Sequence, residues 1–329
     1  MAYSITASFC DLIVIFDLFC EGFLLYMILF RSHHSMKIFR FYLGSLCLSS
    51  TVLSILCGFI WQPEFLTHPL CIYTDGIFQA YLNNRGLAAL SGALAVQYFQ
   101  LLLQSFFYVY SRMNSLYVDQ ITPWRVLWKS VFILLPAAVF GTLLYFSNST
   151  TLYIKRHTSL NLELYVSPAC YFVGDLEADG LVNYAVGFLF TYSAFFASTA
   201  CYVLFRVHRK LRNPSTGTSP RTLKLQRMFF MNVLMQAFVP VILVAAPLLT
   251  ALALEQFGQQ GYGTVLFKIA NVSISLNSLI SCCLVIGITN PYRRQFLKML
   301  RWKTSTDTVA VVSGVAKMRR STEGSRYNV

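Results

Sequence analysis

The sequence predicts an all-α membrane protein, a bundle of seven transmembrane helices with its N-terminus outside the cell and its C-terminus in the cytoplasm. Composition is the first observation: 56% of the 329 residues are hydrophobic and only 12% are charged, whereas roughly a quarter of a soluble domain is charged. The second is segment length, because each apolar segment approaches or exceeds the roughly 20 residues that cross a bilayer. The segments are about 8–30, 41–61, 77–110, 130–147, 182–205, 228–254 and 264–289.

The distribution of positive charge is the third observation, and it gives the orientation. Short cytoplasmic loops of membrane proteins accumulate Lys and Arg. With the N-terminus outside, 22 of the 26 Lys and Arg residues fall on the inner side, and only Lys155 and Arg156 fall in outer loops. The net charge of +13 therefore indicates contact with the anionic headgroups of a lipid bilayer, and nucleic acid is not an expected partner.

One domain is expected over residues 1–303, because no hydrophilic stretch is long enough for a second core. Apolar and basic residues alternate after the last span, which predicts a short amphipathic helix lying in the membrane interface. The apolar residues of this stretch are Phe296, Leu297, Leu300 and Trp302, and the basic ones are Lys298 and Arg301. Residues 304–329 are polar and rich in Ser and Thr, which predicts a disordered cytoplasmic tail.

Two of the nine cysteines lie in loops, and both loops are predicted to face the oxidising outside. Cys71 precedes the third span and Cys170 lies in the long loop after the fourth, so we expect a disulfide between them. The other cysteines lie within spans, where a buried thiol behaves as a small hydrophobe. Asn148 begins an Asn-Ser-Thr sequence in the same outer loop and is a candidate glycosylation site close to the fourth span.

Charged residues inside membrane spans are rare and need a partner or a wet cavity. Asp11, Asp17 and Glu21 occur in the first span, Arg85 in the third and Lys268 in the seventh. At 1.5 Å of rise per residue, Asp17 and Arg85 lie at similar depths below the outer ends of their helices, which predicts a charge network in the outer half. Either these groups contact a ligand, or they pair only to tolerate burial, or the first span begins later than residue 8.

The sixth span contains two prolines, Pro240 and Pro247. Each proline removes a backbone donor and bends the helix. Gln236, four residues before Pro240, is an uncharged polar side chain beside this weakened turn. The combination favours a hinge at the two prolines that moves the basic inner end of the helix. A static kink that improves packing is the alternative.

Amide and hydroxyl side chains recur at helical spacing in two spans. They are Gln97, Gln100 and Gln104 in the third span, and Asn271, Ser275 and Ser278 in the seventh. Such groups most often join helices to one another, and ligand contact is the alternative. A retinal linked to Lys268 is disfavoured, because no carboxylate can be assigned to that lysine. The candidate ligand-binding residues are Asp17, Asn84, Arg85, Tyr184, Gln236, Lys268 and Asn271, and no metal or cofactor is expected.

The inner side is basic, most densely between the fifth and sixth spans. Cationic residues at the ends of two mobile helices can dock an acidic partner or anionic lipid, although anchoring of the spans explains part of the pattern. The third span ends in Tyr108-Val109-Tyr110-Ser111-Arg112, which leaves one guanidinium at the inner boundary. The residues expected to face an inner partner are Arg112, Arg206, Lys210, Lys224, Arg227 and Arg293.

Three features together resemble the nematode serpentine chemoreceptors, nearest to the class H, class I and Str-type groups. They are the outer cysteine pair, Leu225-Gln226-Arg227 followed by Gln236 and Pro240, and Pro291-Tyr292-Arg293 after the last span. The resemblance covers essentially the whole chain. It implies a G-protein-coupled receptor in the cell membrane of a ciliated sensory neuron, with a small environmental molecule as ligand and a heterotrimeric G protein at the basic inner residues. Arg112 has no Asp-Arg-Tyr context, and Gln236 stands where rhodopsin-like receptors carry a Cys-Trp-x-Pro segment.

Other classes of protein fit the sequence less well. A ligand-gated channel or a transporter is the main alternative, but paired Gly or Pro interruptions in matching halves are not evident. An enzyme is disfavoured because the five histidines fall in predicted loops and no HExxH or GxSxG motif is present. We therefore expect ligand to enter the outer half between the third, fifth, sixth and seventh spans, and the inner ends to open for a G protein.

Overall fold

The computed structural model describes residues 5–30, 37–67, 70–74, 84–113, 123–146, 170–172, 180–212, 220–256 and 262–299, without the side chains at several segment ends. Among these residues, seven helices are long and apolar enough to cross a membrane. This confirms the predicted seven-helix fold class. The spans are Ser8–Phe30, Arg40–Trp61, Arg85–Ser111, Trp128–Phe146, Asn183–Arg212, Gln226–Leu254 and Lys268–Ile288.

The helices extend beyond these apolar spans at several ends. Their bounds are α1 Ile5–Phe30, α2 Lys37–Ile55, α3 Asn84–Met113, α4 Pro123–Phe146, α7 Gly180–Arg212, α8 Pro220–Pro240, α9 Ala246–Gln256 and α10 Tyr262–Ile288. Two π-helical turns interrupt the regular helices, η2 at Leu56–Trp61 after α2 and η3 at Val241–Ala245 between α8 and α9. Within the described residues the largest difference from the predicted spans is at the end of the fifth, which was drawn to residue 205 and extends to Arg212. The predicted start of the third span, residue 77, lies outside the described residues.

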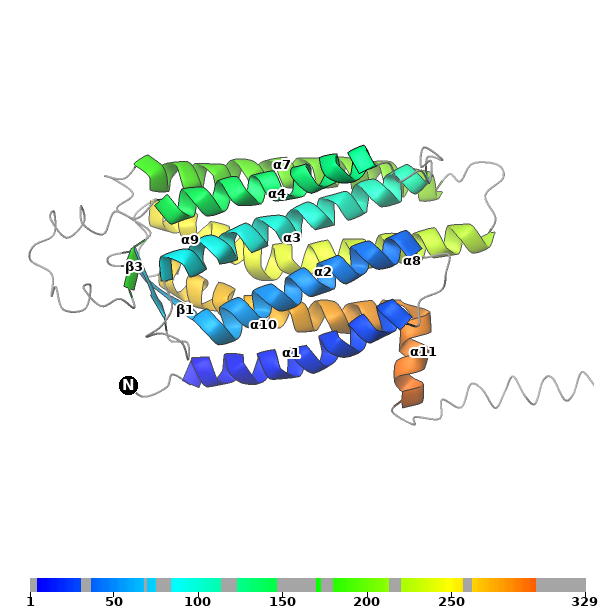
Figure 1. Ribbon diagram of the computed structural model, residues 1–329, viewed down its shortest axis with the longest axis horizontal. Coiled ribbons are helices and arrows are strands. Elements are labelled where there is room, and N and C mark those ends of the chain that lie inside the picture. The colour runs from blue at the N-terminus through cyan, green and yellow to red at the C-terminus, as the bar shows by residue number, and fades with distance from the viewer. Residues whose placement is uncertain are drawn as a thin grey trace, which may run out of the picture. The chain divides into compact units, whose positions relative to one another are not determined.

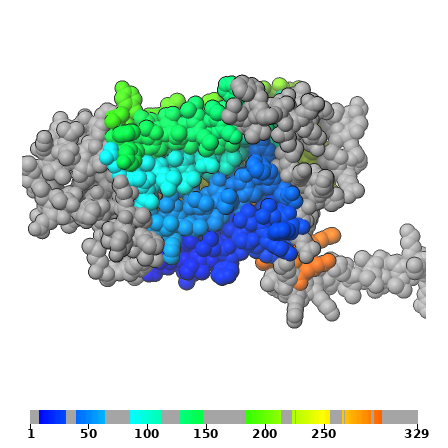
Figure 2. All heavy atoms as spheres, viewed as in Figure 1, coloured from blue at the N-terminus to red at the C-terminus, as the bar shows by residue number. Residues whose placement is uncertain are grey.

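Helix α3 lies at the centre of the bundle. It contacts α2, α4, α7 and α8, and Figure 1 shows it between α1 and α2 on one side and α4 and α7 on the other. The space-filling view shows α4, α3, α2 and α1 following one another across one face (Figure 2). The large side chains with almost no exposure include Phe106, Leu102 and Leu103 of α3. A central helix that touches four others is suited to coupling their movements.

Small residues bring α3 and α4 close together. A Cβ atom on Gly141 of α4 would lie 3.1 Å from Cβ of Ala93 and 3.2 Å from the backbone oxygen of Ala89. A Cβ atom on Gly92 of α3 would collide with Leu144. In a membrane, small residues at an interface let two backbones approach, because lipid supplies little hydrophobic driving force between helices.

A three-stranded antiparallel sheet is an addition to the predicted fold. It consists of β1 Pro63–Thr67, β2 Leu70–Thr74 and β3 Cys170–Phe172 in the order β1-β2-β3. Figure 1 shows it at the end of the bundle where α1 begins and α2 ends. Backbone pairing sets Cys71 opposite Phe172 and Tyr73 opposite Cys170. The two cysteines thus lie on neighbouring strands, but their side chains and Asn148 are outside the described residues, so the disulfide and the glycosylation site stay predictions.

The chain divides into two units, and Ile286–Val329 forms the second. Its helix α11 spans Asn290–Met299 and begins at a turn in which the Thr289 carbonyl accepts bonds from the backbone N–H groups of Tyr292 and Arg293. Arg293, Phe296 and Lys298 are exposed on α11. A helix is therefore present where the amphipathic stretch was predicted, whereas Leu300, Trp302 and the tail at 304–329 lie outside the described residues.

Candidate functional site

Buried polar side chains from five helices meet inside the bundle, and we call this group the polar core. Its members are Asp17 and Glu21 of α1, Cys47 and Ser54 of α2, Tyr98 of α3, Gln236 of α8, and Ser278 and Ser281 of α10. Each is no more than 5% exposed. Burying so many polar groups in lipid is costly unless they bond to one another. We therefore take the polar core as the first candidate for a functional site.

Glu21 joins three helices. The thiol of Cys47 on α2 donates a hydrogen bond to Oε2 of Glu21, and the hydroxyl of Ser278 on α10 donates to Oε1 over 2.8 Å. Both oxygens of the carboxyl group are therefore satisfied by groups from different helices. A side chain held in this way fixes α1, α2 and α10 relative to one another.

Asp17 lies one turn before Glu21 and on the same face of α1, because residues four apart are neighbours on a helix. Its side chain is 0% exposed. The hydroxyls of Ser54 and Ser278 lie beside the carboxyl group, yet neither oxygen has a hydrogen bond of normal geometry within the described part of the chain. The outer-half pairing of Asp17 with Arg85 was wrong, because serines rather than a guanidinium surround this carboxyl.

Tyr98 joins α3 to the bend in α8. Its hydroxyl donates to the backbone oxygen of Gln236 at 3.4 Å. In a regular helix this carbonyl would accept from the N–H of residue 240, but residue 240 is proline and has no N–H. The π-helical turn η3 follows directly at Val241. The hydroxyl of Tyr98 therefore supplies a donor to the carbonyl that Pro240 leaves without its helical partner.

A small cavity lies in the polar core, with a volume of about 10 Å³. Its lining residues are Glu21, Leu24, Leu46, Cys47, Ser50, Tyr98, Gln236, Ser281 and Cys282. A cavity of this size holds about one water molecule. The polar core thus lacks room for an organic ligand in this conformation, and its geometry is suited to transmitting a movement.

A second polar junction joins α1, η2 and α10 near the three-stranded sheet. The amide of Gln62 donates to Oδ1 of Asp11 at 2.7 Å and to the carbonyl of Gly58 at 3.0 Å. Gln62 has a positive φ of 45°, which is uncommon for a residue with a side chain. The amide of Asn271 on α10 donates to the carbonyl of Pro63 at 2.8 Å. The strained turn after η2 is thus held by side chains from α1 and α10.

Arg227 joins the C-terminal end of α7 to the N-terminal half of α8. Its guanidinium donates to the backbone oxygen of Leu211 at 3.2 Å, one of the last carbonyls of α7, which have no partner within the helix. Arg206 of α7 lies 5.6 Å from the centre of the Tyr202 ring and beside the hydroxyl of Tyr110 on α3. Lys210 and Lys224 are exposed, and the side chain of Arg112 is outside the described residues.

The candidate ligand-binding residues are brought together only in part. Asp17 and Gln236 lie in the polar core, whereas Arg85 contacts α4, where it donates to the Tyr145 carbonyl and lies 4.6 Å from the centre of the Tyr145 ring. Tyr184 is 70% exposed on α7, and Lys268 is exposed on α10. The side chain of Asn84 is outside the described residues, and Asn271 donates to the Pro63 carbonyl as stated above.

Three residues of these sites carry no signal in the sequence that sets them apart. Tyr98 is one of 19 tyrosines, and only its position opposite Gln236 gives it a role. Cys47 was interpreted as a small hydrophobe, but it donates to Glu21. Gln62 follows a span and resembles any loop residue until its backbone conformation is known. For Tyr98, the available signal was Pro240, because a proline in a span leaves a carbonyl that needs a hydrogen-bond donor from elsewhere.

Solved structures include one with a related arrangement, the crystal structure of squid rhodopsin. It matches with a TM-score of 0.57 and 11% sequence identity, over 91% of this chain and 85% of that chain. Seven membrane-length helices in this arrangement define a protein with the seven-transmembrane fold. No curated protein matches the sequence. The family model of the serpentine type 7TM GPCR chemoreceptor Srh matches residues 3–302. The chain therefore belongs to the Srh chemoreceptor family, which confirms the nematode serpentine receptor resemblance and is consistent with a protein that is not an enzyme.

Proposed function

We propose that this protein is a chemosensory receptor that binds a small environmental molecule in its outer half and activates a heterotrimeric G protein at its cytoplasmic face. The observation that carries the proposal is the bond from Tyr98 to the Gln236 carbonyl at the Pro240 bend. Through it, the central helix α3 and the bent helix α8 share one contact inside the polar core. Membership of a chemoreceptor family supports the coarser statement that the protein is a receptor.

The outer half is the ligand-binding side of this proposal. Ligand enters between α3, α7, α9 and α10, above the polar core, and the predicted extracellular N-terminus places this side toward the environment. Asn271 and the strained turn at Gln62 lie at that end of α10 and α2. A molecule that displaces α9 or α10 acts on the hinge residues Pro240 and Pro247, because η3 and α9 follow the bend directly.

The inner half is the G-protein-binding side. Movement at Pro240 swings the inner part of α8, which carries Lys224 and Arg227, away from α7 and exposes a basic surface to an acidic partner. The bond from Arg227 to Leu211 holds these helices together, so we assign the structure to the resting conformation. A ligand shifts this equilibrium only by its differential affinity for the two conformations, and a tenfold bias corresponds to about 1.4 kcal/mol.

Expression of the full chain with a promiscuous G-protein reporter tests the proposal. Cells are screened against a panel of volatile and water-soluble compounds. A second cell line expresses the Gln236→Leu receptor at equal surface abundance. A compound that raises the reporter signal with the wild-type receptor but not with Gln236→Leu supports the proposal. A ligand-gated channel or transporter is the competing function. Ion flux or solute uptake in proteoliposomes lacking any G protein would establish that function instead. Immunolocalisation in a ciliated sensory neuron tests the expected site of action.

A further inference from the structure

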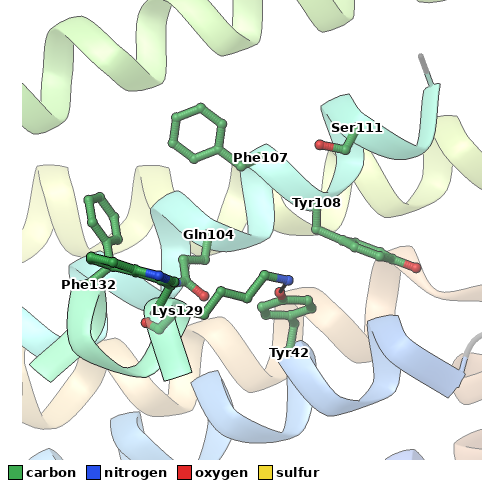
Figure 3. A pocket seen from close by; sticks show the side chains of 8 residues that line it. Tyr42, Gln104, Phe107, Tyr108, Ser111, Lys129 and Phe132 are labelled. Atoms are coloured by element: carbon green, nitrogen blue, oxygen red, sulfur yellow. Dashed lines mark hydrogen bonds between the residues drawn. The ribbon is translucent and has the colours of Figure 1, made fainter. Parts of the chain in front are cut away.

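A groove on the membrane-facing side of α2, α3 and α4 has no part in the proposed signalling path. Its volume is about 390 Å³, within the range of sites for small molecules. The lining residues are Tyr42, Gln104, Phe107, Tyr108, Ser111, Trp128, Lys129 and Phe132 (Figure 3). We propose that this groove binds an anionic phospholipid, with the phosphate at Lys129 and Tyr42 and an acyl chain along the aromatic residues.

The polar end of the groove is built around a lysine. Nζ of Lys129 donates to the hydroxyl oxygen of Tyr42 at 3.3 Å and lies 6.0 Å from the centre of the Tyr42 ring. Figure 3 shows the lysine side chain extending toward this ring. A phenol that accepts this bond can still donate its own O–H, so the two residues offer a cation and a hydroxyl donor to one phosphate. None of the described lining residues is acidic.

The groove is held in shape by contacts below it. The Gln104 amide on α3 donates to the backbone oxygen of Lys129 on α4 at 3.1 Å. The Tyr42 and Tyr108 rings lie 5.3 Å apart between centres and are tilted by 35°. These contacts join α2, α3 and α4 and fix the base of the lysine side chain. The cationic end is therefore preorganised, which lowers the entropic cost of binding.

The apolar end of the groove is open to the surroundings of the bundle. Trp128 is 59% exposed, Phe132 43% and Phe107 39%. All three lie within or at the ends of membrane-length spans. They are therefore surrounded by the hydrocarbon core of the bilayer and by its headgroup region. In a bilayer such aromatic surfaces contact lipid acyl chains. Together with the lysine, this favours a lipid over a water-soluble anion.

The depth of the lysine agrees with a headgroup. Lys129 is the seventh residue of α4, so it lies about 9 Å from the start of that helix at 1.5 Å per residue. In the predicted orientation this start is cytoplasmic, and the cytoplasmic leaflet is the one that contains anionic lipids. A lysine at that depth reaches the phosphate layer with its extended side chain.

Native mass spectrometry of the purified full-length receptor, titrated with dioleoylphosphatidylserine or dioleoylphosphatidylcholine, tests this site. We expect wild type to prefer phosphatidylserine and Lys129→Gln to lose about fivefold of that preference, which corresponds to about 1 kcal/mol. Lys129→Arg keeps the charge and should keep the preference. Phe107→Trp fills the groove while retaining the lysine, and it should weaken binding of both lipids. Lys210→Gln removes an exposed inner lysine elsewhere and is the matched control.

Four results would overturn the proposal. The first is a wild-type receptor without preference between the two lipids. The second is an equal loss of preference in Lys129→Gln and Lys210→Gln, which would mean that the basic inner surface attracts anionic lipid as a whole. The third is unchanged lipid binding in Phe107→Trp, a variant that remains informative if Lys129→Gln does not fold. Displacement of bound phosphatidylserine by a sterol, but not by inorganic phosphate, would reassign the groove to sterols and also overturn it.

Discussion

The hydroxyl of Tyr98 lies 3.4 Å from the backbone oxygen of Gln236, the carbonyl that Pro240 leaves without its helical donor. A proline bend in a membrane helix requires such a replacement, because water is absent from the hydrocarbon core. Here a donor comes from the central helix, α3. This bond therefore links movement of the bend to movement of α3.

Removing the hydroxyl of Tyr98 should loosen the bend. We expect Tyr98→Phe to raise ligand-independent nucleotide exchange on a G protein two- to fivefold, because an interhelical bond in a membrane is worth about 0.6 to 1 kcal/mol. Tyr192→Phe is the matched control, since that hydroxyl also donates to an α3 carbonyl, that of Val96 at 3.4 Å, and the residue four positions later in α3 is Gln100 and not proline. Equal basal nucleotide exchange in the two variants would contradict a specific role of Tyr98 at the bend.

The two carboxyl groups of the polar core should respond oppositely to mutation. Glu21→Leu leaves the donors of Cys47 and Ser278 without an acceptor, which costs about 1 to 3 kcal/mol. Asp17→Asn removes a buried group whose oxygens have no bonds of normal geometry, so it should leave stability unchanged or raise it. A thiol-reactive dye reports unfolding in detergent through the buried Cys57 and Cys282. We expect the melting temperature to fall by roughly 2–10 °C for Glu21→Leu only.

Gly58 should tolerate no larger side chain. A Cβ atom there would lie 2.5 Å from Oγ of Ser275 and 2.6 Å from Cγ2 of Val14, so Gly58→Ala forces α1 or α10 to shift at a cost of about 1 to 3 kcal/mol. Gly22→Ala on α1 has nothing within 4 Å of the new atom, and it should be neutral or stabilising because alanine favours helix. Melting temperatures that fall equally in both variants would contradict this packing.

The bond from Arg227 to Leu211 should restrain the inner end of α8. We expect Arg227→Gln to raise basal G-protein activation two- to fivefold, while Arg227→Lys, which retains a cationic donor, restores at least half of the restraint. The measurement is nucleotide exchange at matched receptor abundance. A loss of signal in both variants would instead mean that Arg227 acts only as part of the basic surface that binds the G protein and contributes no restraint.

The fold was largely predictable, since hydropathy is a local property and span length is set by the bilayer. Charge inside the first span correctly indicated burial of Asp17 and Glu21, and Pro240 correctly indicated an irregular turn. The partners were not predictable, because a contact such as Glu21 with Ser278 depends on how α1 and α10 pack. The third strand of the sheet escaped prediction for the same reason, as β3 pairs with β2 about 100 residues before it. Arg85 shows that equal depth does not make two side chains neighbours.

The central claim is that the bend at Pro240 moves the inner end of α8 and that Tyr98 restrains it. Electron–electron double resonance in nanodiscs measures this movement directly, with spin labels replacing Lys224 on α8 and the exposed Phe41 on α2. The labels are placed in a receptor whose exposed Cys201 and Cys283 are changed to serine. We predict a second, longer-distance population in Tyr98→Phe that is absent from Tyr192→Phe and minor in wild type. Identical distance distributions in all three receptors would contradict the account.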